Sequence, residues 1–250
     1  MIKSFAKINI FLKITGKMAY KGQDYHTLSS RFMLYKDLYD EMEISLDSKE
    51  FEILGNFDCS LDRNTIYRAY KEILPFLNQQ QREILSHLQV VVNKKIPSGG
   101  GLGGGSSNAA SFLCWVNDFC KLDLERERLC EIGSRVGSDV PFFVSGYTMA
   151  NVSGRGEVVE FYDEEALKVE IVNPNIPSNT AQIYEEYSKN FYKPSQENWF
   201  YLENNKILEK SAFEINDLLA PLLKIYPNLN HWVKEGFFLS GSGSCFWRAV

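Results

Sequence analysis

Apolar residues near the start of the chain are mostly spaced two apart, which is typical of a strand with one buried face. They are Phe5, Ile8, Ile10, Leu12 and Ile14. This spacing predicts a β-strand that places Lys7 and Asn9 side by side on its other face or at its margin. A turn is expected over residues 20–26, followed by strands around 28–34 and 40–46.

Further along the chain, apolar spacing alternates between helical and strand periods. It predicts helices over residues 64–77, 106–119, 125–136, from about 180 to 190, and over 212–226 with an interruption at Pro221. Strands are predicted at residues 88–93, 147–152, 157–162, 167–172 and 236–239, while 191–205 is expected to be loop or short helix. We infer two packed α+β halves, residues 1–150 and 151–250.

Composition narrows the possible classes of protein. The chain has 250 residues, 44% of them hydrophobic, and a formal net charge of −5. A chain of this length can bury a sizeable core, so intrinsic disorder is excluded for most of it. Its mild acidity argues against a nucleic-acid surface, which normally needs a basic stripe.

The five cysteines and the N-terminal segment bear on cellular location. The cysteines form no C-x-x-C pair or Cys/His cluster, so we interpret them as reduced thiols without a zinc site or disulfide framework. The first 15 residues lack the continuous apolar core of a signal peptide. No stretch reaches about 18 apolar residues, so we expect a cytoplasmic protein without a membrane span.

A glycine-rich segment, KKIPSGGGLGGGSSNAA, lies between a predicted strand and a predicted helix. Consecutive backbone amides and a helix N-terminus present positive potential there, which suits a phosphate chain. Glycines allow close approach to phosphate oxygens and permit positive φ. Ser106 and Ser107 open the helix, where one can cap it and another can offer its hydroxyl to phosphate or Mg²⁺. The alternative is a flexible surface loop.

Three familiar glycine-loop chemistries do not fit this segment. No Gly-Lys-Ser/Thr ends it, as a P-loop requires. The pattern Gly99-x-Gly101-x-x-Gly104 matches a dinucleotide fingerprint, but the following helix leads into another helix rather than a strand. A protein-kinase glycine loop is accompanied by H-R-D and D-F-G, and both are absent.

The run PSGGGLGGGSS at residues 97–107 resembles the hallmark of the GHMP kinases. Further segments in the expected order extend the resemblance over nearly the whole chain: AKINIFLKITGK (6–17), GQDYHTLSS (22–30), GSDVPFF (137–143) and SGSGSCF (240–246). The resemblance implies an α+β, two-domain GHMP-kinase fold. Its N-terminal domain would be ribosomal protein S5 domain 2-like, and its C-terminal domain, short here, ferredoxin-like α+β.

The resemblance implies two catalytic residues, Lys7 and Asp139. Asp139 matches the aspartate that accepts a proton from the attacking hydroxyl. Lys7, in the pattern A-K-x-N, matches an ammonium that keeps this carboxylate ionised and stabilises developing negative charge. Without the resemblance, Asp139 is as readily explained as a cap of the next helical turn, and Lys7 as a solvent-facing strand lysine.

The resemblance also implies two binding regions. Asn9, Tyr25, His26 and Tyr184 would bind the acceptor, with Tyr25 and Tyr184 clamping a cytosine ring and His26 hydrogen-bonding its edge. Tyr184 can instead be a core position of an amphipathic helix. The residues implied for ATP are Asn64, Pro97, Ser98, Gly99, Gly100, Gly101, Leu102, Gly103, Gly104, Gly105, Ser106 and Ser107. Asn64 is also a good N-cap, Ser107 is a candidate Mg²⁺ ligand, and the loop at 240–244 would close over the phosphates or form a plain hairpin.

The activity implied is ATP-dependent phosphorylation of a hydroxyl on a cytidine-diphosphate sugar alcohol, in isoprenoid precursor synthesis, with Mg²⁺ and without a phosphoenzyme. Two alternatives are another GHMP small-molecule kinase, of mevalonate or homoserine type, and a non-catalytic ATP-binding regulator on the same fold. We expect no nucleic-acid or membrane partner, and a monomer or weak homodimer.

Overall fold

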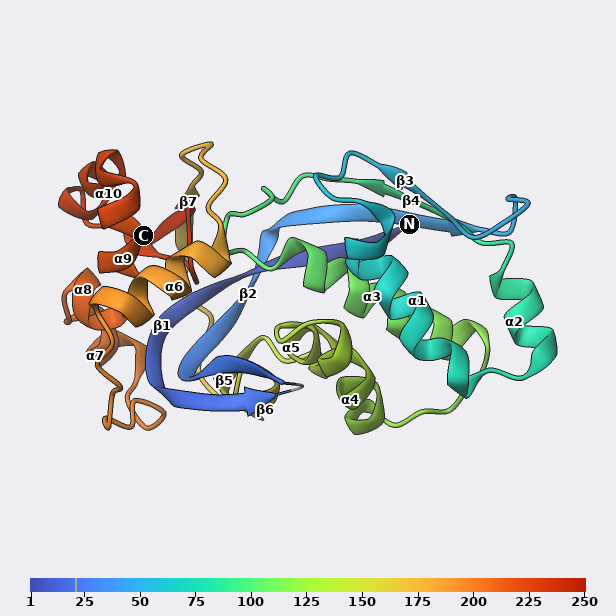
Figure 1. The fold of residues 1–250 in the computed structure, drawn as a ribbon, viewed down its shortest axis with the longest axis horizontal. Helices are drawn as coiled ribbons and strands as arrows, with labels where there is room; N and C mark the ends of the chain where they lie inside the picture. Colours follow the sequence, from blue (N-terminus) through green and yellow to red (C-terminus); the bar gives the residue numbers. More distant parts are fainter. Residues whose placement is uncertain (21) are drawn as a thin grey trace. The chain divides into compact units, whose positions relative to one another are not determined.

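The computed structural model describes residues 1–20 and 22–250 (Figure 1). The chain forms two compact units, each assembled from separate segments. The first unit contains Met1–Ala6, Tyr35–Ile96 and Gly103–Gly146, and the second contains Lys7–Leu34, Pro97–Leu102 and Tyr147–Val250. Two long strands, β1 (Ile2–Tyr20) and β2 (Gln23–Ser45), contribute residues to both units. The division near residue 150 stays a prediction.

The first unit combines a small sheet with helices. Strand β3 (Glu52–Gly55) runs parallel to β4 (Gln89–Asn93), which is antiparallel to the C-terminal part of β2. The helices are α1 (Thr65–Ile73), α2 (Gln79–Leu85), α3 (Gly104–Phe119), α4 (Arg126–Val136) and α5 (Val140–Ser145). Short 3₁₀ turns, Leu61–Arg63 and Leu74–Phe76, flank α1. Helices α1 and α3 lie on one side of these strands (Figure 1).

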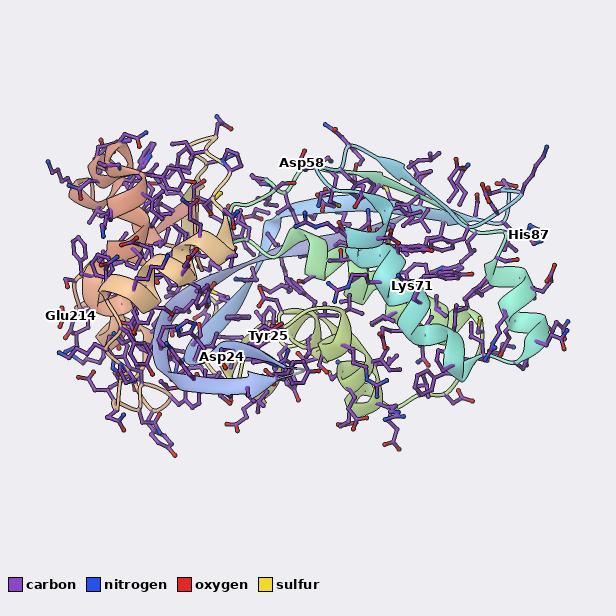
Figure 2. All side chains as sticks on the ribbon, viewed as in Figure 1. Asp24, Tyr25, Asp58, Lys71, His87 and Glu214 are labelled. Carbon is purple, nitrogen blue, oxygen red and sulfur yellow. The ribbon has the colours of Figure 1, made fainter. Side chains whose placement is uncertain are left out.

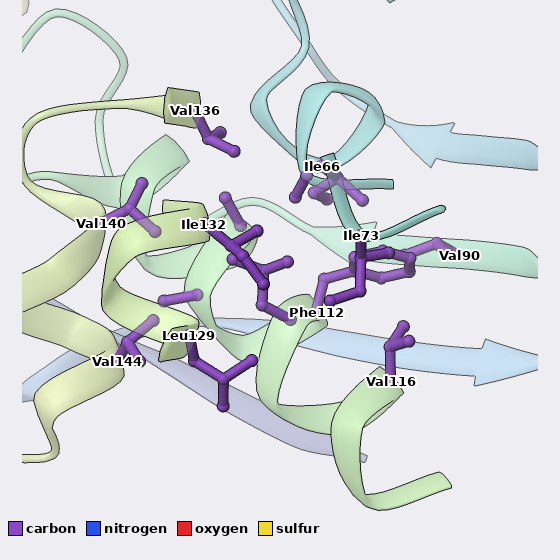
Figure 3. Close-up of a cluster of buried hydrophobic side chains, with 14 of the residues drawn as sticks. Ile66, Ile73, Val90, Phe112, Val116, Leu129, Ile132, Val136, Val140 and Val144 are labelled. Carbon is purple, nitrogen blue, oxygen red and sulfur yellow. The ribbon is translucent and has the colours of Figure 1, made fainter. Parts of the chain in front are cut away.

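The core of the first unit lies between the sheet and these helices (Figure 3). Alternate residues Val90 and Val92 of β4 are buried, whereas Val91 between them is exposed, as the period of a strand requires. Helix α3 contributes Phe112 and Val116. Burying a side chain of this size stabilises the fold by roughly 1.5–3 kcal/mol, so the segment before the glycine loop and the helix after it are firmly held.

A buried carboxylate, Asp40 of β2, binds the chain on both sides of the glycine loop. Its Oδ1 accepts hydrogen bonds from the amides of Lys95 (2.7 Å) and Ile96 (2.9 Å). Its Oδ2 pairs with the Lys94 ammonium and accepts a bond from Asn108 Nδ2 in α3 at 3.0 Å. Asp40 is 0% exposed, and its charge is compensated by Lys94. The charge of Lys94 is therefore neutralised within the protein.

The second unit contains part of the six-stranded sheet to which β2 belongs and the whole of a three-stranded sheet. The N-terminal part of β2 is antiparallel to β5 (Met149–Ser153), which is antiparallel to β6 (Val158–Phe161); β1 pairs with β2. The other sheet has the order β7-β9-β8, formed by Val169–Val172, Phe246–Ala249 and Phe238–Leu239. The helices of the second unit are α6 (Thr180–Asn190), α7 (Asn204–Leu208), α8 (Ala212–Ile215), α9 (Leu219–Ile225) and α10 (Asn230–Lys234), with a 3₁₀ turn at Pro227–Leu229.

Most predicted elements are present, with two instructive errors. The turn expected over residues 20–26 is too long, because β1 ends at Tyr20 and β2 begins at Gln23; Lys21 lies outside the described residues. The helix predicted over 212–226 is interrupted at Asn216 and not at Pro221. Pro221 lies in the first turn of α9, where a backbone N–H has no helical acceptor. Helices α2, α5 and α10 and strands β3 and β9 were not predicted.

Two expectations from composition can be compared with the described residues. None of the helices in residues 1–20 and 22–250 has the length and apolar character needed to cross a bilayer. The cysteines described there are all free thiols, and no group of three or more His, Cys, Asp or Glu side chains in the same ranges is arranged to hold a metal ion.

We expect Asp40→Ala to destabilise the first unit strongly. The substitution leaves the Lys94 ammonium without its carboxylate and two backbone amides without acceptors, and breaking a buried ion pair in this way costs about 3–5 kcal/mol. Urea denaturation measures the free energy of unfolding. Glu41→Ala is the matched control, because Glu41 pairs with Lys95 at the surface. An equal effect of the two substitutions would contradict the anchoring role of Asp40.

Candidate active site

The glycine loop enters the second unit as residues 97–102, and its carbonyl groups are bound by other segments of that unit. Gly99 O accepts hydrogen bonds from the amides of Ser178 (3.3 Å) and Ser244 (3.0 Å). Gly100 O accepts from the amide of Cys245 at 3.1 Å, and Gly101 O from Ser240 Oγ at 3.1 Å. Within the described part of this unit, the amides of residues 98–102 meet no backbone acceptor. The loop therefore presents donors, as an anion-binding loop does.

The glycines at 99–101 are required by packing within the protein. Gly101 has φ +75°, and a Cβ there would collide with the carbonyl of Ser240. Gly99 has φ +66°, and a Cβ on Gly100 would lie 2.7 Å from Cys245 Sγ. From the sequence, these glycines are expected to allow close approach of phosphate. The structure adds a second reason for glycine here, which is the close approach of residues 240–245.

The loop at residues 240–244 joins β8 to β9 and is held by buried side chains. Asn216 Nδ2 donates to Leu239 O (3.1 Å) and Gly241 O (2.9 Å). Ser178 Oγ donates to Gly243 O at 2.6 Å. These bonds fix the loop that in turn binds the carbonyls of the glycine loop. Its closure over a phosphate chain stays a prediction.

Lys7 of β1 is only 3% exposed, so its interpretation as a solvent-facing strand lysine is wrong. Its Nζ lies 2.6 Å from Asn9 Oδ1 and 3.0 Å from Gly101 O, and its amide donates to Leu102 O at 2.9 Å. The ring of Phe32 lies beneath the ammonium, 4.5 Å away at its centroid. Strand β1 thus binds the glycine loop through both the backbone and the side chain of Lys7.

In the first unit, the glycine-rich segment continues as the start of α3. The residue before this helix is Gly103, with φ +73° and no side-chain cap, so the prediction that Ser106 or Ser107 caps the helix is wrong. Both serines lie in its first turn. Thr65 Oγ1 donates to Gly105 O at 2.6 Å and binds the start of α1 to the start of α3. The free amides of a helix N-terminus favour an anion.

Asn64 caps α1 as predicted. Its Oδ1 accepts a hydrogen bond from the amide of Ile66 at 2.9 Å, and the side chain is buried. Because the oxygen of Asn64 caps the helix, its carboxamide nitrogen is the group that would contact an adenine. That contact stays a prediction.

Asp139 directly precedes α5 and is half-buried. Its side chain makes no capping hydrogen bond to that helix, so the interpretation of Asp139 as a simple cap is wrong. The turn before it lies close to α3, because a Cβ on Gly137 would be 3.6 Å from Ser106 Oγ. Within the first unit, the turn that carries Asp139 and the start of α3 that carries Ser106 are therefore neighbours.

Tyr25, which Figure 2 labels, and His26 are consecutive residues of β2. Tyr25 packs against Tyr20, with ring centroids 5.9 Å apart, and the Arg155 guanidinium lies 5.5 Å from its ring. His26 lies beside Tyr184, with centroids 5.3 Å apart and an interplanar angle of 33°. The structure thus brings His26 to Tyr184. The clamp formed by Tyr25 and Tyr184 stays a prediction.

Tyr184 is half-buried on α6, whereas Ile183 and Tyr187 are the buried positions of that helix. The alternative that Tyr184 is a core position is therefore wrong. His26 Nε2 lies 2.8 Å from Ser188 Oγ on the same helix. Burial, followed by the nearby Lys17 ammonium, lowers the pKa of His26 from its ordinary value of 6.5. A neutral imidazole is favoured at this site.

Several residues of the site were missed by sequence reasoning. Asn216 and Ser178 hold the loops, Ser30 contacts Asn9, and Trp247 Nε1 donates to Asn9 O at 3.0 Å. Ser30 lies inside the segment GQDYHTLSS, which was itself a signal. The other three act through contacts distant in sequence, for which the sequence holds no local pattern.

Comparison with known proteins places this geometry in a family. The model of the GHMP kinases N-terminal domain matches residues 64–147. A 4-diphosphocytidyl-2-C-methyl-D-erythritol kinase from Sulfurimonas denitrificans is 43% identical and covers 99% of this chain and 96% of its own. One from Campylobacter jejuni is 38% identical over 99% of both chains. The chain belongs to the 4-diphosphocytidyl-2-C-methyl-D-erythritol kinase family of GHMP kinases. It is therefore a kinase, and ATP is its co-substrate.

Solved structures confirm the predicted fold class for this member of the family. A crystal structure of 4-(cytidine 5'-diphospho)-2C-methyl-D-erythritol kinase is similar with a TM-score of 0.74 and 25% identity, covering 100% of this chain and 89% of the other. The Methanococcus jannaschii mevalonate kinase shares the fold, with a TM-score of 0.64 and 17% identity over 100% of this chain and 90% of that one. The α+β GHMP-kinase fold is thus confirmed.

We expect this kinase to lose stability on acidification in part through His26. Its pKa is lower in the folded chain, so the unfolded chain binds a proton first and is favoured as the pH falls through about 6.5. The stabilising effect of the neutral ring is complete above that pH. Urea midpoints measured from about pH 8 to about pH 5.5 should fall more for the native chain than for His26→Gln. If the urea midpoints of the two proteins fall equally with pH, His26 does not contribute to the loss of stability.

Proposed function

We propose that this kinase transfers the γ-phosphoryl group of ATP to the 2-hydroxyl of 4-diphosphocytidyl-2-C-methyl-D-erythritol. The products are the 2-phosphate and ADP, in the non-mevalonate route to isoprenoid precursors. The observation that carries the proposal is full-length similarity to relatives of that name, 43% and 38% identical over 99% of the chain. The transfer is direct, without a phosphoenzyme.

The chemistry assigned to the chain's own residues is proton acceptance and charge stabilisation. Asp139 accepts the proton of the attacking hydroxyl, and its carboxylate makes no capping hydrogen bond to α5. An aspartate is a weak base toward an alcohol, so positioning and charge neutralisation supply most of the acceleration. Lys7 stabilises the negative charge that develops during transfer. Its burial supports this role, because a cation has a larger electrostatic effect where water is excluded.

The ATP phosphates are bound by the glycine-rich segment, residues 97–107. Two features support this: the loop carbonyls are already bound within the second unit, and residues 104–107 open α3 in the first unit. Backbone amides of this segment then act as donors to phosphate oxygens. Asn64 contacts the adenine with its carboxamide nitrogen, since its oxygen caps α1.

Mg²⁺ fits the oxygen donors near the start of α3. The first unit offers the hydroxyl of Ser107 and the carboxylate of Asp139, which are the hard oxygen donors that this ion prefers. Few protein ligands are needed, because Mg²⁺ keeps several waters and is bound mainly by the phosphates. When bound, the ion neutralises charge on the transferred group. Ser107 is the ligand we assign to it.

The cytidine end of the acceptor binds beside β2 and α6, in the second unit. His26 and Tyr184 already lie together, and the neutral imidazole can both donate to and accept from the edge of cytosine. Tyr25 supplies a second aromatic face, and Asn9 contacts the sugar alcohol. Aromatic faces suit a base because stacking is largely independent of hydrogen-bond pattern.

The remaining assignments concern partners and location. We assign a cytoplasmic location, small-molecule partners only, and a monomer or weak homodimer. The net charge of −5 supports the absence of a nucleic-acid partner, since binding to phosphate backbones depends on a basic surface.

The proposal is tested by an assay of ADP release with three acceptors in parallel. We expect turnover with 4-diphosphocytidyl-2-C-methyl-D-erythritol and none above background with mevalonate or homoserine. Turnover with mevalonate or homoserine alone would assign the chain to another GHMP activity. ATP binding without turnover on any acceptor would instead support a regulator on the same fold.

We expect Asp139→Asn to bind ATP normally but to lose turnover by about 10²–10⁴-fold, the range associated with a general base. The amide keeps the size of the side chain and cannot accept the proton. Asp118→Asn, on the exposed face of α3, is the control that should behave as the native enzyme. Near-native turnover of Asp139→Asn would remove Asp139 from this role.

A further inference from the structure

Ser30 of β2 is completely buried next to Asn9 and makes two hydrogen bonds of opposite direction. Its hydroxyl proton is donated to the carbonyl of Phe11 in β1. Its oxygen accepts a hydrogen bond from Asn9 Nδ2 at 2.9 Å. Ser30 has 0% exposure, so water does not compete for either bond. No part of the proposed reaction above uses this serine.

The direction of these bonds determines which end of the Asn9 carboxamide faces Lys7. Because the hydroxyl proton is committed to a carbonyl, Ser30 can only accept from Asn9, and only Nδ2 can donate. Asn9 Oδ1 is therefore turned toward Lys7 Nζ, 2.6 Å away. A carboxamide turned the other way would present N–H groups to an ammonium, which also has only donors.

Two further contacts hold this arrangement in place within the second unit. Trp247 Nε1 donates to the backbone carbonyl of Asn9 at 3.0 Å, and Trp247 is 0% exposed. The Lys7 ammonium also donates to Gly101 O at 3.0 Å, in the glycine loop. Two neutral oxygens on different segments thus help to locate the ammonium, and the orientation of one of them depends on Ser30.

We propose that Ser30 is a positioning residue that fixes the Lys7 ammonium through Asn9. This rests on the proposed function insofar as Lys7 stabilises the phosphoryl group. Ser30 does not touch the substrate; it sets the polarity of the carboxamide that holds the ammonium. Removing its hydroxyl frees the carboxamide to rotate, and the ammonium loses an oriented acceptor.

The chain supplies a matched control in the adjacent serine. Ser29 is also buried, at 7% exposure, but its Oγ has no hydrogen-bond partner among the described residues. Ser29→Ala and Ser30→Ala therefore remove the same atom from neighbouring positions of one strand. Only the second substitution removes a bond to Asn9.

The first test is kinetic and uses a double-mutant cycle with Asn9→Ala. We expect Ser30→Ala to lower kcat about tenfold, the value of roughly one hydrogen bond, with little change in the KM for ATP. Ser29→Ala should keep native kcat, and Ser30→Thr should restore it. In the Asn9→Ala background, Ser30→Ala should cause no further loss, because the path to Lys7 is already broken.

Two kinetic results would overturn the proposal. One is an equal loss of kcat from Ser30→Ala with and without Asn9, which indicates a structural effect independent of Lys7. The other is native kcat in Ser30→Ala. Melting temperatures identify a variant that is merely unstable. If Ser30→Ala does not fold, Ser30→Thr and Ser30→Val form the comparison, since they have the same shape and only threonine keeps the hydroxyl.

The second test needs no substrate and so separates this inference from the proposed function. In protein labelled with ¹⁵N-lysine, the Lys7 ammonium signal is identified by its loss in Lys7→Met. We expect slow hydrogen exchange of this signal in the native chain and Ser29→Ala, and fast exchange in Ser30→Ala. Unchanged exchange in Ser30→Ala would overturn the proposal. If these exchange differences are present but the native enzyme does not turn over the cytidine acceptor, only the proposed function is overturned.

Discussion

The central constraint in this kinase is the burial of the Lys7 ammonium, which oxygens of neighbouring segments hold in place. Lys7 is held by oxygens of Asn9 and Gly101, and both are neutral. Neutral acceptors of this kind orient a cation without cancelling its charge. Burial strengthens the electrostatic effect of the ammonium because little solvent screens its charge. The glycine loop, the loop at 240–244 and strand β9 all serve to keep these oxygens in place.

The two lysines before the glycine loop are paired with carboxylates. Lys94 is neutralised by Asp40 and Lys95 pairs with Glu41, so their charges stabilise the fold. Lys7 reaches the glycine loop from β1, and its ammonium donates to the amide oxygen of Asn9 and to the backbone oxygen of Gly101.

Sequence reasoning succeeded where the determinants are local. The strand through Lys7, the glycine loop and the Asn64 cap each depend on spacing or on a residue type within a few positions. It failed at two helix ends and where a distant segment decides the outcome. The interruption predicted at Pro221 was wrong because Pro221 lies in the first turn of α9, and a serine cap on α3 was wrong because Gly103 precedes the helix. The burial of Ser30 and Asp40 likewise depends on packing between segments far apart in the chain.

The bond from Trp247 to Asn9 joins residues separated by 238 positions. Contacts of such high sequence separation form late, because a long loop must close before they become favourable. During synthesis, the strand that carries Lys7 leaves the ribosome long before β9 exists. The strand that carries Lys7 therefore acquires this support only after β9 has been synthesised, and shorter nascent fragments lack the bond from Trp247.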